Sequence, residues 1–416
     1  MCPSKRPVSA VLKPPEVDIA VIGGGLIGSL FSLAAAKSGF TVGLIDAVTG
    51  YGDRSAFDGR AYALSQASCR MLAALGFREL LHRRSQEIEA IQITDGRAGE
   101  GAGPFKLRLE SAECGIGPMG RMIEDRFLRG ALTEAVAGCT GIRLLSTEVR
   151  AVAFENGHAR PEINGGLSCS LVAGCDGRNS VVAASAGIRY SVREYSQSAI
   201  VCAVEHGQPH AATAHQFFMP NGPLAILPLQ GNISSLVWTT THAEARHLSE
   251  LDSDGFLAEL RPRFGSFLGE LGLVGSRARF PLSLTRAESF TATRAALLGE
   301  AATALHPLAG QGLNLGFRDA ASLTETLTAA RRRGEDIGEP AVLERYQSWR
   351  RLDATLFAGA TDGFNRLFSS DNPLLRTTRG LGMAAVDHLP HLRRRLIREA
   401  AGLTGTLPSL LVGPPV

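Results

Sequence analysis

The sequence is poor in the features that mark a disulfide scaffold, a structural zinc site or a secreted protein. Its seven cysteines are odd in number and scattered, and no two of them form a C-x-x-C pair. A disulfide framework and a zinc centre are therefore not expected, and no metal ligand is assigned. The first 16 residues lack the apolar core of a secretory signal. These absences favour a reducing, cytoplasmic location.

An excess of charge of one sign is missing as well. Lysine and arginine number 43 against 40 aspartates and glutamates, which gives a formal net charge of +3. A balance this even does not indicate a nucleic-acid partner, and none is expected. Apolar residues make up 44% of the chain and charged residues 20%, without low-complexity tracts. This composition is typical of a globular protein that buries a large core.

One uncharged stretch has the length of a membrane span. Ile19 to Ala36 is eighteen residues without a charge. Three adjacent glycines, Gly23 to Gly25, interrupt this stretch and would weaken a spanning helix. We interpret it instead as a buried strand, a tight turn and a helix.

The length of 416 residues and the pattern of apolar runs predict two or three domains. A βαβ unit opens the chain, and residues 61–76 are predicted to form a helix. From about residue 196, short strand-like runs separated by Gly, Pro and Asn indicate an inserted antiparallel sheet. The expected order is a leader (1–16), a Rossmann-like α/β domain that also lends strands near 88–110 to the second domain (17–190), the inserted antiparallel β-sheet (191–285), a return to the first domain (286–335) and a helical C-terminal region (336–416).

The first chemical motif is Gly23-x-Gly25-x-x-Gly28, which follows the first strand and opens a helix. Gly23 allows the tight turn, Gly25 lets the backbone approach a pyrophosphate, and Gly28 permits close packing of the helix on the strand. Asp46 ends the next strand, eighteen residues after Gly28, where a carboxylate accepts hydrogen bonds from a ribose. This context predicts a dinucleotide site and leaves NAD and FAD both open.

Two later segments bear on that choice. Asp176-Gly177 forms a turn at the end of a strand, and Asn179 or Ser180 is placed to cap the helix that follows. In the third motif a strand ends at the carboxylate of Glu300, and backbone N–H groups are left open at a helix start. Such a helix end carries partial positive charge, which suits an anionic reduced flavin. This motif reads Gly299-Glu300 and then Pro307, Gly310, Gln311, Gly312, Leu313 and Asn314.

With these three motifs in order, the sequence resembles the FAD-dependent aromatic hydroxylases (class A flavoprotein monooxygenases) along almost its whole length. Finer stretches are similar to the ubiquinone-biosynthesis hydroxylase branch of that family. They are Arg-Ala-Tyr-Ala-Leu-Ser at 60–65, Gly-Pro-Leu-Ala-Ile-Leu-Pro-Leu at 222–229 and the segment 305–316. The resemblance implies that the first domain binds FAD and that the inserted sheet is a substrate domain.

The resemblance also implies roles for single residues. Gly23, Gly25 and Gly28 match the turn at the FAD pyrophosphate, and Asp46 matches the ribose acid. The remaining matches are Arg60 and Arg126 as contacts to the cofactor, Asp176 and Gly177 as a motif that serves both FAD and a transient nicotinamide, and Glu300, Pro307, Gly310, Gln311, Gly312, Leu313 and Asn314 as the flavin-side loop. Many members have Asp in place of Glu300, which puts the contact to the ribityl chain in question.

The reaction implied by the resemblance needs no catalytic side chain, because the flavin carries the chemistry. NAD(P)H reduces the flavin, O2 adds at C4a, and the hydroperoxide transfers one oxygen atom to a phenolic ring. No second G-x-G-x-x-G follows another strand, in keeping with a reductant that binds transiently. The protein must keep water from the hydroperoxide, and the inserted sheet is expected to act as a lid. Phe217, Leu227 and Pro228 are the candidate pocket-lining residues, with ordinary sheet core as the alternative.

The expected substrate is a polyprenylated phenol or quinone precursor. The alternatives are a hydroxylase of a small soluble aromatic acid and a non-catalytic flavin-holding subunit of a biosynthetic complex. A soluble acid would call for a cationic residue in the inserted sheet, and residues 214–240 contain no Arg or Lys. The basic cluster at 391–398, with apolar residues interleaved, suggests contact with the surface of the inner membrane or with other quinone-biosynthesis proteins. The alternative for this cluster is a solvated helix face.

Overall fold

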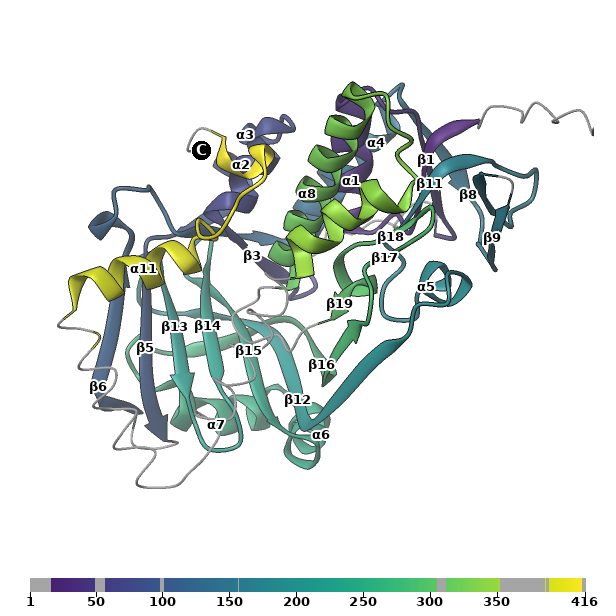
Figure 1. Cartoon of the computed structure of the whole chain (residues 1–416). Coiled ribbons are helices and arrows are strands. Elements are labelled where there is room, and N and C mark those ends of the chain that lie inside the picture. The colour runs from purple at the N-terminus through teal and green to yellow at the C-terminus, as the bar shows by residue number, and fades with distance from the viewer. Residues whose placement is uncertain are drawn as a thin grey trace, which may run out of the picture.

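The computed structural model describes residues 16–48, 57–97, 101–155, 157–304, 312–351, 386 and 389–413. Figure 1 shows two large sheets, one flanked by α1 and α8 and the other by α6 and α7, with two long strands running from one sheet region to the other. The α/β fold class predicted from the sequence is confirmed.

The first large sheet has the strand order β17-β18-β11-β1-β2-β8. β1 (Val17–Ile22) lies at its centre because its apolar side chains are buried, as in a strand covered on both faces. It pairs in parallel with β2 (Val42–Asp46) on one side and β11 (Cys169–Gly174) on the other, so the carboxyl ends of these three strands meet at one edge. The other strands are β8 (Ile142–Ser146), β9 (Val152–Glu155), β10 (His158–Pro161), β17 (Thr291–Ala292) and β18 (Ala295–Leu297).

Helices cover this sheet. α1 (Leu26–Lys37) is almost entirely buried, which fits its run of Leu, Phe and Ala, and it lies beside the long helix α8 (Gly312–Arg332) in Figure 1. A further helix occupies residues 340–351. The remaining helices of this part are α4 (Asp125–Ala137), α5 (Val181–Ser185) and the 3-10 turn η2 (Gly299–Ala301).

The second large sheet has the order β19-β16-β12-β15-β14-β13-β5-β6, and all its pairs are antiparallel except β13 with β5. Helices α6 (His242–Glu250) and α7 (Ser253–Phe264) pack on one face, where Phe256 of α7 lies against Trp238 of the sheet. β12 (Tyr190–His206) and β16 (Leu271–Ala287) are the long strands. The others are β5 (Ala90–Arg97), β6 (Gly101–Glu110), β13 (Thr213–Phe218), β14 (Leu224–Leu229), β15 (Ile233–Thr241) and β19 (Thr303–Ala304).

A small sheet, β3-β7-β4, packs on the opposite face of the second sheet. It corrects one prediction, because residues 61–76 are not one helix. β3 (Ala61–Ser65) pairs with β7 (Gly120–Glu124), and the helix begins only after Ser65, whose hydroxyl accepts a hydrogen bond from the backbone N–H of Ser68. A partner strand about sixty residues away thus overrides local helical spacing. The elements around it are α2 (Gln66–Ala74), α3 (Arg78–Arg84), β4 (Ser85–Ile88) and the 3-10 turn η1 (Ser111–Glu113).

Near the C-terminus, α11 (Pro390–Ala400) crosses the β6 end of the second sheet, and α12 (Ser409–Val412) contacts α2 and α8. In the described part of the chain, no helix combines the length and the apolar character that crossing a membrane requires.

Candidate functional site

The three sequence motifs meet at the carboxyl edge of the first sheet. The first of them is the turn between β1 and α1. Gly23 has φ of +98°, and a Cβ there would lie 2.4 Å from the backbone oxygen of Cys175. A Cβ on Gly28 would lie 1.8 Å from the oxygen of Gly23. Gly25 differs, because a Cβ there would meet nothing within 4 Å. Two glycines therefore serve packing, and the third leaves open space at the N-terminus of α1, where an anion is favoured.

Asp46 closes this turn from the next strand. Its Oδ2 accepts a hydrogen bond of 2.5 Å from the backbone N–H of Gly24, and its Oδ1 accepts one of 2.8 Å from Val48. The carboxylate is partly exposed at the end of β2. The structure thus brings Asp46 against the glycine turn, on the side where the sequence predicts a ribose.

Asp176 and Gly177 follow β11, the strand beside β1. Asp176 Oδ2 accepts hydrogen bonds from the backbone N–H groups of Val181 (2.7 Å) and Val182 (3.3 Å), which fixes the start of α5. The other oxygen, Oδ1, is buried and has no hydrogen-bond partner among the described residues. Burial raises the pKa of the Asp176 carboxyl. A buried acceptor without a donor is costly, so this oxygen is a place where a ligand hydroxyl or amide would be stabilised.

The third motif is held against the same helix. Ile27 of α1 fills a notch between two glycines, because Cβ atoms on Gly299 and Gly316 would lie 3.2 Å and 2.5 Å from its side chain. Glu300 is exposed and receives a hydrogen bond of 3.3 Å from Arg178 Nε, next to the Asp176-Gly177 turn. One turn of α1 therefore sets the spacing between all three motifs.

The flavin-side loop is described only from its last residues. Gly312 is the first residue of α8 and is exposed, and Leu313 packs partly against the core. The side chain of Asn314 serves the fold: its Oδ1 accepts from the backbone N–H of Ser65 (2.8 Å) and from Ser68 Oγ (2.7 Å). This ties the start of α8 to the start of α2. The predicted residues Pro307, Gly310 and Gln311 lie outside the described residues.

Arg60 and Arg126 lie at neighbouring ends of β3 and β7, where the Asp125 backbone N–H donates to the Arg60 oxygen. The Arg60 guanidinium pairs with Asp58 at 2.6 Å and lies 3.6 Å from the Asp125 carboxylate. Arg126 donates to Glu124 over 2.6 Å and lies over the ring of Phe127. The structure brings the two arginines together, each held by an acidic partner.

The three candidate pocket residues do not share one face of the second sheet. Leu227 packs among the side chains on the face toward the small sheet β3-β7-β4. Phe217 is buried in the core on the other face, which α6 and α7 cover. Pro228 follows Leu227 on β14, and alternation along the strand places it on the face opposite to Leu227. Of the three, Leu227 is the one turned toward the first domain.

Sequence reasoning missed a buried ion pair behind the third motif. Asp319 Oδ2 accepts from the backbone N–H of Gly299 (2.9 Å), and Asp319 Oδ1 accepts from Arg350 Nε (2.7 Å). Tyr346 donates from its hydroxyl to the oxygen of Leu297 over 2.8 Å. All three side chains are buried. The one sequence signal was the adjacent pair Arg318 and Asp319 in a stretch of α8 that is otherwise uncharged from Gly312 to Thr324.

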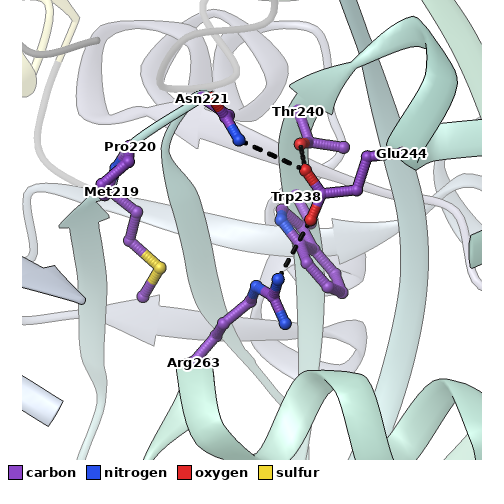
Figure 2. A pocket seen from close by; sticks show the side chains of 7 residues that line it. All are labelled: Met219, Pro220, Asn221, Trp238, Thr240, Glu244 and Arg263. Atoms are coloured by element: carbon purple, nitrogen blue, oxygen red, sulfur yellow. Dashed lines mark hydrogen bonds and ion pairs between the residues drawn. The ribbon is translucent and has the colours of Figure 1, made fainter. Parts of the chain in front are cut away.

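A separate cavity of about 130 Å³ lies at the opposite end of the second sheet, between the β13–β14 turn and helices α6 and α7. In Figure 2 the carboxylate of Glu244 lies between the side chains of Asn221, Thr240 and Arg263. That carboxylate accepts hydrogen bonds from Arg263 (3.0 Å), Asn221 (3.5 Å) and Thr240. The polar groups satisfy one another, so we interpret this cavity as part of the packing under the sheet.

Comparison with known proteins identifies the family of this chain. Residues 16–358 match the FAD binding domain family. The ubiquinone hydroxylase UbiL of Rhodospirillum rubrum is 39% identical over 406 residues, which span 96% of this chain and 93% of that protein. The chain belongs to this FAD-binding family, in the branch of the ubiquinone hydroxylases. The 3-demethoxyubiquinol 3-hydroxylase of Escherichia coli is a further relative, 32% identical over 93% of this chain and 98% of its own length.

Solved structures of flavin enzymes share the fold of this FAD-binding family member. The p-nitrophenol 4-monooxygenase PnpA from Pseudomonas putida aligns with a TM-score of 0.76, covering 93% of this chain and 98% of its own, at 19% identity. The flavin-dependent monooxygenase PieE, determined in complex with FAD and substrate, aligns with a TM-score of 0.67 over 94% of this chain and 72% of its own, at 18% identity. At these identities the likeness establishes the fold.

The residues of this chain fit FAD. The open space at Gly25 faces the N-terminus of α1, as a pyrophosphate requires. Gly177, with φ of +78°, also leaves room for a ligand, since a Cβ there would meet nothing within 4 Å. Asp176 Oδ1, next to Gly177 in the chain, is a buried acceptor without a partner among the described residues. The chain therefore has an anion site, an open backbone surface and a buried acceptor along one edge of the sheet.

Proposed function

We propose that this flavoprotein hydroxylates the ring of a polyprenylated phenol or quinone precursor in ubiquinone biosynthesis, with NAD(P)H as transient reductant and O2 as co-substrate. The observation that carries the proposal is the meeting of three sequence-distant motifs on one turn of α1, with Ile27 between Gly299 and Gly316. The similarity to ubiquinone hydroxylases over almost the whole chain supports the choice of substrate class.

Bound FAD supplies the activation of O2 and the insertion of one oxygen atom. The chain's own residues bind and orient the cofactor. The α1 N-terminus at Gly25 would hold the pyrophosphate, Asp46 would accept hydrogen bonds from the ribose hydroxyls, and Asp176 would accept a hydrogen bond from the cofactor. Glu300, which receives a hydrogen bond from Arg178, would contact the ribityl chain. Gly177 and the first residues of α8 (Gly312 to Asn314) line the flavin side.

The rest of the chain shields the reaction from water. The second sheet presents Leu227 and Leu229 toward the small sheet, where Ile88 and Met122 pack against them. An apolar layer of this kind lowers the access of water to the reacting centre. It also suits an apolar substrate, since the strands from residue 214 to residue 240 carry no Arg or Lys to hold a carboxylate. We therefore favour a polyprenylated phenol over a small soluble aromatic acid.

The lipid substrate also favours a location on the cytoplasmic side, peripheral to the inner membrane. Other proteins that make the same quinone are the expected neighbours there.

The quinone profile of the host tests the proposal. Deletion of the gene should cause a quinone intermediate that lacks one ring oxygen to accumulate, and a plasmid copy of the gene should restore the mature quinone. An unchanged profile in a host without a second hydroxylase of this family would contradict it. Stimulation of NAD(P)H oxidation by a quinone precursor would in turn reject the non-catalytic alternative.

A further inference from the structure

The basic cluster near the C-terminus lies on α11, and one side of this helix is anchored. Ile397 is fully buried against Leu107 and Leu109 of β6. On the same side, the Arg393 guanidinium pairs with the Glu113 carboxylate and donates to the backbone oxygen of Arg108 over 2.7 Å. α11 is thus a fixed part of the surface.

The outward side of α11 combines free positive charge with exposed leucines. Arg394, Arg395 and Arg398 are exposed, and none of them has an ion-pair partner among the described residues. Leu389, the N-cap residue of α11, and Leu392, one turn before Arg395, are 52% and 37% exposed. We call these five residues the α11 surface.

The acidic groups near the helix have other main partners. Glu113 pairs with Arg393 on the anchored side and attracts Arg394 only at longer range. Glu399, the acidic residue of α11 itself, accepts a hydrogen bond from Thr404 Oγ1. Three exposed guanidinium groups without an ion-pair partner among the described residues, together with exposed leucines, match the chemistry of a bilayer surface, where phosphates bind arginine and apolar side chains enter the acyl boundary.

The α11 surface also lies near the face of the sheet that borders the site. Ile91 of β5 packs both against the residues under α11 and against the group that contains Leu229 and Met122. Figure 1 shows α11 lying across this end of the second sheet. A bilayer bound to α11 would therefore adjoin the sheet face that we assign to the substrate.

We propose that the α11 surface docks the protein on an anionic phospholipid bilayer. The proposal rests on the proposed function for its purpose, because a polyprenylated substrate is dissolved in the membrane, but its physical basis is the charge and exposure of these five residues. The occupant is a phospholipid headgroup layer of negative charge.

Vesicle flotation with the full-length holoprotein tests the docking. The probes are vesicles of phosphatidylcholine alone and of phosphatidylcholine mixed with phosphatidylglycerol. The wild-type protein should float with the mixed vesicles, lose binding as salt is raised, and bind the neutral vesicles weakly. The triple variant Arg394→Gln, Arg395→Gln, Arg398→Gln should lower the partition coefficient roughly 100-fold, and Leu389→Ser with Leu392→Ser should lower it roughly 10-fold or more.

A matched control variant distinguishes the effect of the α11 surface on vesicle binding from the effect of the protein's net charge. Arg246→Gln, Arg261→Gln and Arg332→Gln remove the same charge from exposed sites on α6, α7 and α8 and should leave vesicle binding unchanged. The FAD content and the melting temperature of the α11 variants should match the wild type, which shows that they are folded.

Equal binding by the wild type and the α11 triple variant, or an equal loss in the control variant, would overturn the proposal. So would an α11 triple variant that keeps vesicle binding and loses association with proteins of its host, because the surface would then be a protein interface. None of these results depends on hydroxylation. The quinone profile of the deletion strain therefore tests the proposed function independently of vesicle binding.

Discussion

Two alanine substitutions in the glycine turn separate cofactor binding from folding. A Cβ at Gly25 meets nothing within 4 Å, and φ there is −64°, which any residue adopts. Gly25→Ala should therefore cost no more than about 1 kcal/mol of unfolding free energy, the order of an altered helix N-cap. A Cβ at Gly28 lies 1.8 Å from the backbone oxygen of Gly23, so strand and helix must move apart.

The two variants should differ in whether FAD affinity or stability is the property that falls first. In Gly25→Ala the new methyl group stands where the pyrophosphate approaches, and an overpacked contact costs about 1 to 3 kcal/mol. FAD affinity should then fall roughly 5- to 150-fold with little loss of stability. In Gly28→Ala the clash with rigid backbone should cost about 3 kcal/mol or more of stability, and FAD binding should fall with it.

The assays are urea unfolding of the cofactor-free proteins and FAD titration by quenching of flavin fluorescence. If Gly25→Ala binds FAD as tightly as the wild type, the open space at Gly25 is not the pyrophosphate site. If Gly25→Ala is as unstable as Gly28→Ala, the two glycines do not have the separate roles given to them here.

Two further predictions concern buried ionisable side chains. Asp319→Asn removes the negative charge that pairs with the Arg350 guanidinium, 1% exposed, and should cost about 3 to 5 kcal/mol in urea unfolding. FAD affinity should also fall, because the single amide oxygen of Asn replaces the two carboxylate oxygens that accept from Gly299 and Arg350. His215 is buried beside Phe217 and Phe267, and burial lowers the pKa of its imidazole to about 4. The unfolded chain binds this proton first as pH falls, so the contribution of His215, about 3 kcal/mol at most, is present above pH 6.5 and is lost between pH 6.5 and 4.

Each of these has its own control. Asp336 pairs with the buried Arg294 but is itself 42% exposed, and Glu339 lies 3.9 Å from the same guanidinium as a second counter-charge, so Asp336→Asn should cost about 1 kcal/mol or less. A cost equal to that of Asp319→Asn would show that burial does not set the difference. For His215, the Gln variant should lose the part of the acid destabilisation that falls between pH 6.5 and 4. An unchanged pH profile in that variant would show that other groups are responsible.

The sequence was most informative where chemistry is local. A glycine turn between a buried strand and a helix needs φ above zero at Gly23 and close packing at Gly28. Glycine meets both requirements, so the residue types alone predict this turn. The parallel pairing of β1 with β2 was accessible for the same reason, since a helix between two short apolar strands indicates a βαβ unit.

Contacts between residues far apart in the chain determine the features that could not be predicted from the sequence. Residues 61–65 have helical spacing and become a strand because β7, far along the chain, pairs with them. β16 was not predicted, since its exposed polar residues hide a strand that is fixed by pairing with β12. The bond from Asp319 to Gly299, supported by Arg350, joins three segments, and no local pattern specifies it. Whether Phe217 or Leu227 faces the site likewise depended on which face of the sheet α6 and α7 cover.

The flavin content of the purified chain shows whether the three motifs together bind FAD. Our prediction is a yellow protein that carries about one FAD per chain, and a Gly28→Ala protein that is colourless or takes up FAD only weakly. A folded wild-type chain that is isolated without flavin, and whose fluorescence titration with added FAD shows no binding, would contradict it.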